Sequence, residues 1–541
     1  MATTRRVRRT MLAAVAALAM GVGMAQTATS SQPGDGRDAA AEVAAAAPVK
    51  ARLTGHPKEV TPSGKAQAKH PRPVPPPRLT ATKRELDAAA RQAPGAKRPR
   101  IGNRKGQAPL LAPPGKSFSY EGATQNTGLY PPDTHGAVGK VNFVEVTNGE
   151  GVSVFTKTTG TLQKQTSFAS FFNYTDQTIF DPRVAYDKTW NRWVVTAEAF
   201  PEAGGAQYYF VAVSKTSDPK GSYVITQINV SGLGGFFDYP QLGLDQDAVL
   251  TTANIFSDED AYLGSVAFGI GKAQLYNGLD FDAPAFDLGT PGTVAPPIVE
   301  DNNTNSFFVA ASPADNTHLK LFKGSNLGRS AATIVTAPDV TVSAFSAPAP
   351  ASQPGTDQTL DALDARFQNN STQIGNQLLN VHSTGSVQST PTWYQINTGT
   401  SALTAGGIFY ETATSDDFNP SIVGSTVNGT NANPIGQFFV TWSATDIGGM
   451  NTTPHQVRVK GSGRLATDPV SFAGGSTFGP TASTFYNPDA DPVGRWGDYS
   501  AVAIDPSPAT NCPVGNRAYL VNERQNSQTQ WSSRWGRLGF C

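Results

Sequence analysis

The sequence predicts an all-β protein built from repeated four-stranded sheets. The chain has 541 residues and holds 53 Gly and 40 Pro, while only 16% of its residues are charged. This composition is typical of turn-rich β proteins. Short runs of alternating apolar and polar residues recur along most of the chain, and helical patterns rich in Leu, Glu and Lys are nearly absent after residue 95.

Residues 1–25 have the parts of a secretory signal peptide. Four arginines precede an apolar, Ala-rich run over residues 11–24, and Gly23-Met24-Ala25 offers a small-x-small cleavage site. A membrane anchor is the alternative, but no stretch reaches the ~18 apolar residues of a transmembrane helix. We therefore expect a secreted protein, extracellular or associated with the cell wall, without a transmembrane segment.

Residues 26–116 are expected to form a disordered Ala/Pro-rich basic linker or pro-segment. Residues 31–117 carry 17 basic and 6 acidic residues, a net charge of +11, and such a segment buries too little apolar surface to fold. Only residues 80–92 predict a helix, with Thr82 as its N-cap. The segment is interpreted as a flexible spacer or, alternatively, as a cover that binds the rest of the chain.

The remaining chain is acidic. Residues 118–541 hold 21 basic and 36 acidic residues, a net charge of −15. This balance argues against nucleic acid and anionic membrane surfaces as partners. It also means that the basic segment and the acidic remainder attract each other.

Residues 180–198 show the repeated pattern most clearly. Val184 and Tyr186 alternate with smaller or polar neighbours, residues 187–191 have turn chemistry, and an apolar face resumes at Trp193. Two further strand-like runs follow at residues 208–213 and 223–228. Together these runs predict one antiparallel, four-stranded sheet.

Six more units share a polar or Pro-led start, an alternating strand, a turn and a more apolar second strand. Their strands are expected at 142–147 and 152–156, 248–254 and 261–269, 306–312 and 319–323, 377–383 and 392–397, 436–443 and 456–461, and 517–523 and 534–540. Four-stranded units at this spacing predict a single β-propeller with seven blades over residues 117–541. A tandem of β-sandwiches is the alternative, but it predicts no common start motif.

Two features concern the closure of the ring. Cys512 and Cys541, the two cysteines of the chain, are expected to form a disulfide within the last unit of an exported protein. A monomer is expected, because a closed ring leaves no free sheet edge for pairing.

Three stretches carry a resemblance to a known group. They are Pro-Pro-Asp-Thr-His-Gly-Ala-Val-Gly at 131–139, Asp-Pro-Arg-Val-Ala-Tyr-Asp at 181–187 with the following Arg192-Trp193, and Arg-Trp-Gly-Asp-Tyr-Ser-Ala-Val-Ala-Ile-Asp-Pro at 495–506. From about residue 126 to the end, the chain resembles secreted bacterial seven-bladed β-propeller proteins of sialidase-like type. The resemblance implies a fold and an extracellular location rather than a defined activity. Sialidase activity is not expected, because the Ser-x-Asp-x-Gly-x-Thr-Trp repeat and the Phe-Arg-Ile-Pro motif are absent.

The candidate site consists of polar residues at the starts of the first strands, together with Glu198, His382 and Trp442 at the ends of second strands, which could reach the same mouth of the central channel or the opposite one. In a propeller the first strand of each blade lines the central channel, so its start should lie at one mouth of that channel. The candidate catalytic residues are Asp181, Arg183, Glu198, Asp364, Arg366 and His135. The candidate ligand-binding residues are Asp133, Asp238, Gln241, His382, Trp442, Arg495, Asp498 and Tyr499.

These residue types suit carbohydrate chemistry. Clustered carboxylates raise one another's pKa values, so that one can act as an acid beside another that is a base or nucleophile. Arginines from separate blades could clamp an acidic sugar, and a His with a Tyr could serve β-elimination on a uronic acid. The structural alternative is that the aspartates cap turns and the Arg–Asp pairs tie neighbouring blades together.

Three functions are therefore weighed. The chain is interpreted first as a propeller that binds extracellular polysaccharide or a cell-surface component. The alternatives are a glycoside hydrolase or polysaccharide lyase, and a structural spacer. An enzyme should show two carboxylates or a His–Tyr pair around an open pocket, whereas a binding module should expose aromatic platforms such as Trp393, Trp442 or Trp531.

No cofactor or metal is assigned from the sequence, and Ca²⁺ is the cation considered. Its candidate ligands are the acidic run at 257–260 and the alternating Asn487, Asp489 and Asp491. A solvated loop is favoured over a Ca²⁺ site for the first candidate, and an ordinary turn for the second. A Gly-x-Ser-x-Gly elbow, a His-Glu-x-x-His motif and a phosphate-binding Gly loop are absent.

Overall fold

The computed structural model describes residues 46–69, 71–73, 108–201, 205–449 and 451–541. Among these residues the elements are almost all strands, and the helices are limited to short turns such as α2 (Phe168–Phe171) and α3 (Lys272–Leu275). The all-β prediction is thus confirmed. The signal peptide at 1–25 and the helix at 80–92 lie outside the described residues.

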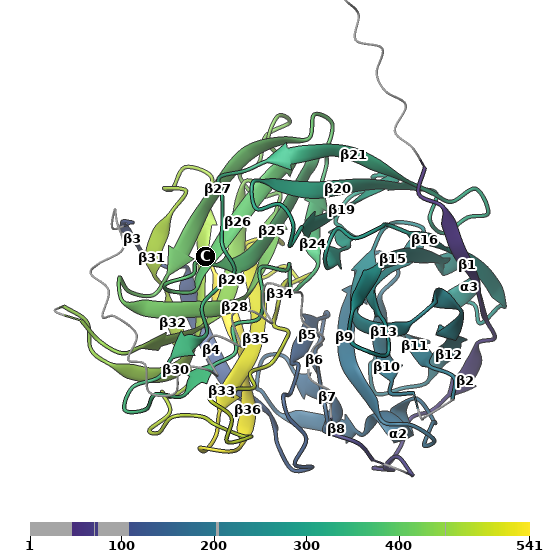
Figure 1. The fold of residues 1–541 in the computed structure, drawn as a ribbon, viewed down its shortest axis with the longest axis horizontal. Coiled ribbons are helices and arrows are strands. Elements are labelled where there is room, and N and C mark those ends of the chain that lie inside the picture. Colours follow the sequence, from purple (N-terminus) through teal and green to yellow (C-terminus); the bar gives the residue numbers. More distant parts are fainter. Residues whose placement is uncertain (1–45, 70, 74–107, 202–204, 450) are drawn as a thin grey trace, which may run out of the picture. The chain divides into compact units, whose positions relative to one another are not determined.

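The sheet predicted around residues 180–198 is present. Strands β9 (Ile179–Asp187), β10 (Arg192–Ala199), β11 (Tyr208–Ser214) and β12 (Tyr223–Asn229) pair in this order, each antiparallel to the next (Figure 1). Successive side chains of a strand point to opposite faces. Val195 therefore packs in one hydrophobic cluster and Val194 in another, so that both faces of the sheet are buried.

Further antiparallel meanders of the same kind follow along the chain. Their strands are β5 (His135–Val138), β6 (Asn142–Thr147), β7 (Gly151–Thr156) and β8 (Leu162–Thr166); β13 (Phe236–Leu244), β14 (Ala248–Phe256), β15 (Tyr262–Gly271) and β16 (Phe281–Asp287); β17 (Val294–Ala295), β19 (Asn305–Ala311), β20 (His318–Ser325) and β21 (Thr333–Thr341); β24 (Ser371–Ile374), β25 (Gln377–Thr384), β26 (Thr390–Asn397) and β27 (Ala402–Tyr410); β28 (Ser415–Ser425), β29 (Gln437–Asp446), β30 (His455–Leu465) and β32 (Ser476–Phe478); and β34 (Ala501–Ile504), β35 (Arg517–Gln525) and β36 (Trp531–Gly539).

The first strands of six of the meanders, together with β18 (Pro297–Val299), follow one another in a closed order. Strand β5 contacts β9, β9 contacts β13, β24 contacts β28, β28 contacts β34, and β34 returns to β5. Strand β18 (Pro297–Val299) fills the remaining step, because it pairs in parallel with both β13 and β24. These inner strands give the described part of the chain a β-propeller-like fold.

The last meander is completed by an earlier part of the chain. Strand β4 (Gly115–Thr124) pairs antiparallel with β36, so the outermost strand of this sheet precedes the first meander in sequence. The expected start of the propeller at residue 117 falls inside β4. Cys512 and Cys541 form the predicted disulfide, which ties the loop before β35 to the end of the chain.

Part of the basic N-terminal segment forms strands. Strand β1 (Val49–Gly55) pairs antiparallel with β16, and β2 (Lys58–Val60) pairs with β12 (Figure 1). Strand β3 (Leu110–Leu111) pairs in parallel with β31 (Phe472–Gly474). The expectation of a disordered segment is therefore wrong for these residues, because sheet edges supply hydrogen-bond partners that the segment lacks by itself.

Charge complementarity accompanies this pairing. Arg52 forms an ion pair with Asp282, and Lys50 forms one with Asp287. Leu53 is 2% exposed and packs in the cluster between neighbouring sheets. The attraction expected between the basic segment and the acidic remainder is present at these contacts. In the part of the chain that the structure describes, no helix is long and apolar enough to cross a membrane.

The packing of β1 predicts that Leu53→Ala destabilises the whole unit. Removing a buried Leu side chain costs roughly 2–5 kcal/mol of unfolding free energy. Val49→Ala is the matched control, because Val49 lies in the same strand with 51% of its surface exposed. Urea denaturation checks both variants, and equal midpoints for Leu53→Ala and the parent chain would contradict the observed docking of β1.

Candidate functional site

Three inner strands begin with the same backbone distortion. Asp181, Tyr239 and Asn419 have φ values of 52°, 58° and 49°, and each is followed by a proline. The strand register shifts at each of these positions. A proline cannot donate to a strand ladder, and the extra residue forms a β-bulge. Positive φ in residues other than Gly is a strained conformation that clusters at functional sites.

The bulges direct polar side chains toward a shared segment. Arg183 follows the first bulge and donates to the carbonyl of Gln368 at 3.0 Å and to Oδ1 of Asn369 at 3.0 Å. Gln241 follows the second bulge and donates to the carbonyl of Phe367 at 2.7 Å. Residues 367–369, just before β24, thus connect the starts of β9 and β13.

Residues 497–500 form the other side of this network. The ring of Tyr499 lies 3.3 Å from the Arg183 guanidinium, and its hydroxyl donates to Asp181 at 2.5 Å. The backbone N–H of Asp498 donates to Asp133 at 2.8 Å. Asn419 donates to the carbonyls of residues 497 and 499. The starts of the inner strands are therefore joined by hydrogen bonds between buried groups.

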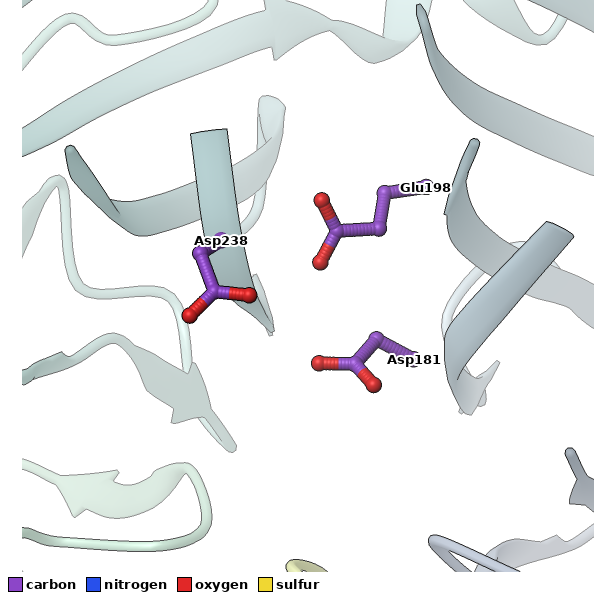
Figure 2. A group of neighbouring side chains, drawn as sticks. All are labelled: Asp181, Glu198 and Asp238. Carbon is purple, nitrogen blue, oxygen red and sulfur yellow. The ribbon is translucent and has the colours of Figure 1, made fainter. Parts of the chain in front are cut away.

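Asp181, Glu198 and Asp238 form an acidic triad (Figure 2). They lie on β9, β10 and β13, and each places one carboxylate oxygen within 4.8 Å of the other two. All three side chains are buried. Glu198 accepts a hydrogen bond from Gln207 at 3.0 Å. The sequence-predicted carboxylates of two adjacent sheets thus meet at one point.

Burial is the largest cause of the raised pKa values of four carboxyl groups near the starts of the inner strands. Burial and the neighbouring Asp238 carboxylate raise the pKa of Asp181 to about 7. Burial also raises the pKa of Asp498 to about 7, against the lowering effect of Arg495. The pKa values of Asp133 and Glu523 are raised well above the usual range, chiefly by burial. Such groups hold protons near neutral pH and can donate them.

The triad is the group of described residues whose donor set suits a metal ion. Three carboxylate oxygens are ligands that Ca²⁺ accepts. The two sequence candidates are less suited: the run at 258–260 is an exposed turn, and Asp491 is exposed. Ca²⁺ binding stays a prediction from the sequence.

A cavity of about 290 Å³, here called the Arg366 cavity, lies beside this network. Arg366 forms a bidentate ion pair with Asp364, with Nε–Oδ1 at 2.7 Å and an Nη–Oδ2 distance of 3.0 Å. Its guanidinium stacks 4.5 Å over the ring of Tyr239, the residue next to Asp238. The other lining residues include Thr293, Ser312, Asn316, Phe345 and Ser346.

His382 lies behind this cavity. One ring nitrogen is 2.6 Å from the carbonyl of Ala365, and the other is 3.1 Å from the hydroxyl of Tyr394. Its ring packs between Phe345 and Phe367. Burial lowers the pKa of His382 to about 4, so the ring is neutral at physiological pH. A His–Tyr pair thus exists, but Tyr394 rather than Tyr499 is the partner, and both side chains are buried.

His135 lies apart from the triad. It accepts a hydrogen bond from the backbone N–H of Val184 at 3.3 Å and lines a second cavity farther along the inner strands. Burial and the charge of Arg183 lower its pKa well below the usual value. The structure therefore does not place His135 together with the candidate catalytic carboxylates.

The three tryptophans named as platforms for a binding module are buried. Trp393, Trp442 and Trp531 have no exposed surface. Trp442 packs in a hydrophobic cluster and donates to Asp417 at 2.9 Å. A flat sugar cannot stack on these rings, because neighbouring sheets cover both faces.

The sequence analysis did not identify several residues that contact the predicted carboxylates or line the Arg366 cavity. Asn148 donates a hydrogen bond to Asp133 at 2.6 Å. Gln207 donates one to Glu198 at 3.0 Å. Ser312, Asn316 and Phe345 line the Arg366 cavity from loops that follow β19 and β21. A run of small polar residues is an ordinary loop signal, so nothing in the sequence singles them out.

Comparisons with known proteins find distant structural similarity. No protein-family model matches the sequence, and no curated protein matches it. A protein of unknown function from Dyadobacter fermentans has 12% identity and a TM-score of 0.35, covering 66% of this chain and 93% of that one. An exo-β-1,3-galactanase from Phanerochaete chrysosporium has 14% identity and a TM-score of 0.30, covering 79% and 96%. A chain of a mitotic checkpoint complex has 10% identity and a TM-score of 0.34, covering 80% and 98%.

These similarities are too low to carry an argument about activity. The propeller-like character implied by the sequence resemblance agrees with the closed order of inner strands described above. The sialidase-like type and the count of seven blades stay predictions.

Because the pKa of Asp181 is raised, we predict that Asp181→Asn stabilises the fold relative to the parent chain, and that this stabilisation grows as the pH rises. An unfolded Asp ionises near pH 4, whereas folded Asp181 ionises near 7. Ionisation in this interval therefore favours unfolding, by roughly 1.4 kcal/mol per pH unit. Relative to the parent, Asp181→Asn should gain about 3 kcal/mol of unfolding free energy between pH 5 and pH 8.

Urea unfolding at the two pH values measures this difference. Asp357→Asn is the control, because Asp357 is an exposed carboxylate away from the triad. A gain for Asp181→Asn that is equal at pH 5 and pH 8 would show that the Asp181 carboxylate is not held in its protonated form.

Proposed function

We propose that this chain is a secreted, monomeric seven-bladed β-propeller that binds a neutral carbohydrate in the Arg366 cavity. The cavity itself is the observation that carries the proposal. It is bounded by the loops that precede β17, follow β19 and follow β21, and by the segment before β24. At about 290 Å³ it has the size of the smaller ligand pockets, which suits one or two sugar rings.

The lining supports a carbohydrate over an apolar ligand. Hydroxyl and amide groups of Thr293, Ser312, Asn316 and Ser346 can exchange hydrogen bonds with sugar hydroxyls. Phe345 adds an aromatic surface against which the C–H face of a sugar can pack. A small number of polar groups around an aromatic side chain fixes both the position and the orientation of a ligand.

The charges support a neutral sugar over an acidic one. Arg366 and Asp364 are the charged residues that line the cavity, and they neutralise each other through their bidentate pair. The guanidinium is also stacked on Tyr239. A uronate would have to compete with Asp364 for Arg366, and that exchange would leave a buried carboxylate without its partner.

Two further features fit an extracellular binding protein. The N-terminal sequence has a signal-peptide pattern, and the two cysteines are joined in a disulfide, which persists in oxidising compartments. A secreted protein of this kind would encounter polysaccharides outside the cell.

The antiparallel meanders that begin with β5, β9, β13, β17, β24, β28 and β34 support the count of seven blades.

The cavity predicts specific effects on binding. Isothermal titration calorimetry with neutral oligosaccharides and with uronate-containing ones should detect at least one neutral ligand and a weaker response to its uronate analogue. Ala314→Trp should reduce affinity at least tenfold, because Ala314 is exposed at the cavity wall and a Trp would fill the space. Ala466→Trp is the matched control, an exposed Ala in another meander that lines no described cavity.

Equal binding by the two Trp variants would place the ligand elsewhere on the surface. Preference for the uronate would show that Arg366 recognises a carboxylate and would overturn the neutral-sugar assignment.

The acidic triad favours a second candidate function, hydrolysis of a glycosidic bond. Glycosidases use two carboxyl groups, one protonated and one ionised, a few ångströms apart. Asp181 has a pKa raised to about 7 by burial and by the nearby Asp238, and it lies beside Glu198 and Asp238. The burial of all three groups ranks this function below binding, because a substrate could reach them only if covering groups such as Tyr499, which bonds to Asp181, moved.

Product release tests the second candidate. Incubation with neutral polysaccharides should yield new reducing ends only if the triad is catalytic, and these should disappear in Glu198→Gln. Sugar binding without any released product would leave the Arg366 cavity as the functional site.

A further inference from the structure

The opposite ends of the inner strands enclose an apolar funnel. A cavity of about 90 Å³ lies between β5, β9, β18, β24, β28 and β34. Much of its wall is aliphatic, with Val138, Ile298, Val423, Val502 and Ile504 among the lining residues. An apolar cavity favours ligands that bring carbon rather than polar groups. The funnel shares no lining residue with the Arg366 cavity.

A smaller and more polar cavity adjoins this funnel. Its volume is about 60 Å³, and Tyr186, Lys188, Ile298 and Glu300 line both spaces. The acidic lining residues of the smaller cavity are Asp187, Asp245, Glu300 and Asp301, and the basic ones are Lys188 and Lys272. Four carboxylates against two ammonium groups leave two negative charges in excess.

The two lysines are already engaged. Lys272 forms an ion pair with Asp187 at 2.6 Å, and Lys188 forms one with Glu300. Asp245 accepts from the hydroxyl of Ser306, and Asp301 accepts from backbone N–H groups of Asn303 and Gly375. Within the described ranges, neither Asp245 nor Asp301 takes part in an ion pair.

We infer that this end of the inner strands binds a primary ammonium group on an aliphatic chain. The methylenes would occupy the funnel, and the ammonium would lie between Glu300 and Asp301 in the adjoining cavity. Burial of the chain supplies affinity, and the excess negative charge selects a cation over an alcohol or a carboxylate. A lysine side chain of a protein partner and a free alkylamine share this chemistry.

Ligand-observed NMR and calorimetry on the full chain test the apolar half of the inference. The probes are methylammonium, propylammonium and pentylammonium chloride at pH 7. Each buried methylene should improve affinity about fourfold, so pentylammonium should bind roughly sixteenfold more tightly than propylammonium. Equal affinities along this series, or no binding by any member at millimolar concentration, would overturn the inference.

The charged half is tested on the same unmodified chain. Pentan-1-ol and pentanoate have the same carbon chain without the positive charge, so both should bind at least tenfold more weakly than pentylammonium. Equal binding of pentan-1-ol would show that the acidic residues do not contribute. This comparison holds even if a substituted chain fails to fold.

Substitutions then locate the ammonium. Glu300→Gln removes one negative charge from the shared rim and leaves Lys188 to repel a cation, so pentylammonium affinity should fall at least tenfold. Asp258→Asn is the control, because it removes a charge from an exposed turn that lines none of the described cavities. Equal affinities of the two variants would contradict the site.

One more probe distinguishes the sources of the ammonium. Nα-acetyl-lysine methylamide should bind as tightly as butylammonium if the natural ligand is a lysine on a protein, since the funnel must then admit the peptide backbone at its mouth. Binding of butylammonium alone would assign a free alkylamine. Both results support the ammonium site, and failure of both probes would overturn it.

Discussion

The guanidinium of Arg183 is the point on which the centre of this protein depends. It stacks on Tyr499 and donates to groups of residues 240, 368 and 369, so that one side chain connects the inner strands of several sheets. Arg183 is 1% exposed, and a buried charge is tolerated only when its donors are satisfied. The inner strands must therefore approach closely enough to supply these acceptors.

This constraint decides where a ligand can bind. The hydrogen bonds around Arg183 and residues 497–500 occupy the starts of the inner strands, where a polar channel mouth was expected. The acidic triad is buried within the same region. The spaces with room for a ligand lie beside this network, at the Arg366 cavity, and beyond it, at the apolar ends of the inner strands. The groups at the starts of the inner strands hold the sheets together, and the proposed ligands would bind beside them and farther along the same strands.

Much of the strand layout follows from the sequence alone. The pattern at residues 180–198 predicted the antiparallel strands β9 and β10, because apolar residues alternate there with polar ones. Strands β1 and β2 were missed for the opposite reason. They add to existing sheet edges through backbone hydrogen bonds, and Leu53 is the buried hydrophobic residue among them, so their composition resembles a linker.

The candidate site was predictable only in part. The meeting of Asp181, Glu198 and Asp238 follows from their positions near the starts of β9 and β13 and, for Glu198, at the end of the antiparallel strand β10. Their burial does not, because it depends on partners such as Gln207 and Tyr499 from distant or unpatterned segments. The same holds for His135, the first residue of β5, which lines a cavity together with residues of other inner strands such as Val184 and Ala501.

A crystal structure of the chain soaked with neutral sugars at saturating concentration would test the central claim most directly. The account predicts a sugar ring in the Arg366 cavity, in contact with Phe345 and Asn316, with Arg183 and Tyr499 still stacked. A sugar bound at the acidic triad with residues 497–500 displaced, or an empty Arg366 cavity at saturation, would contradict it.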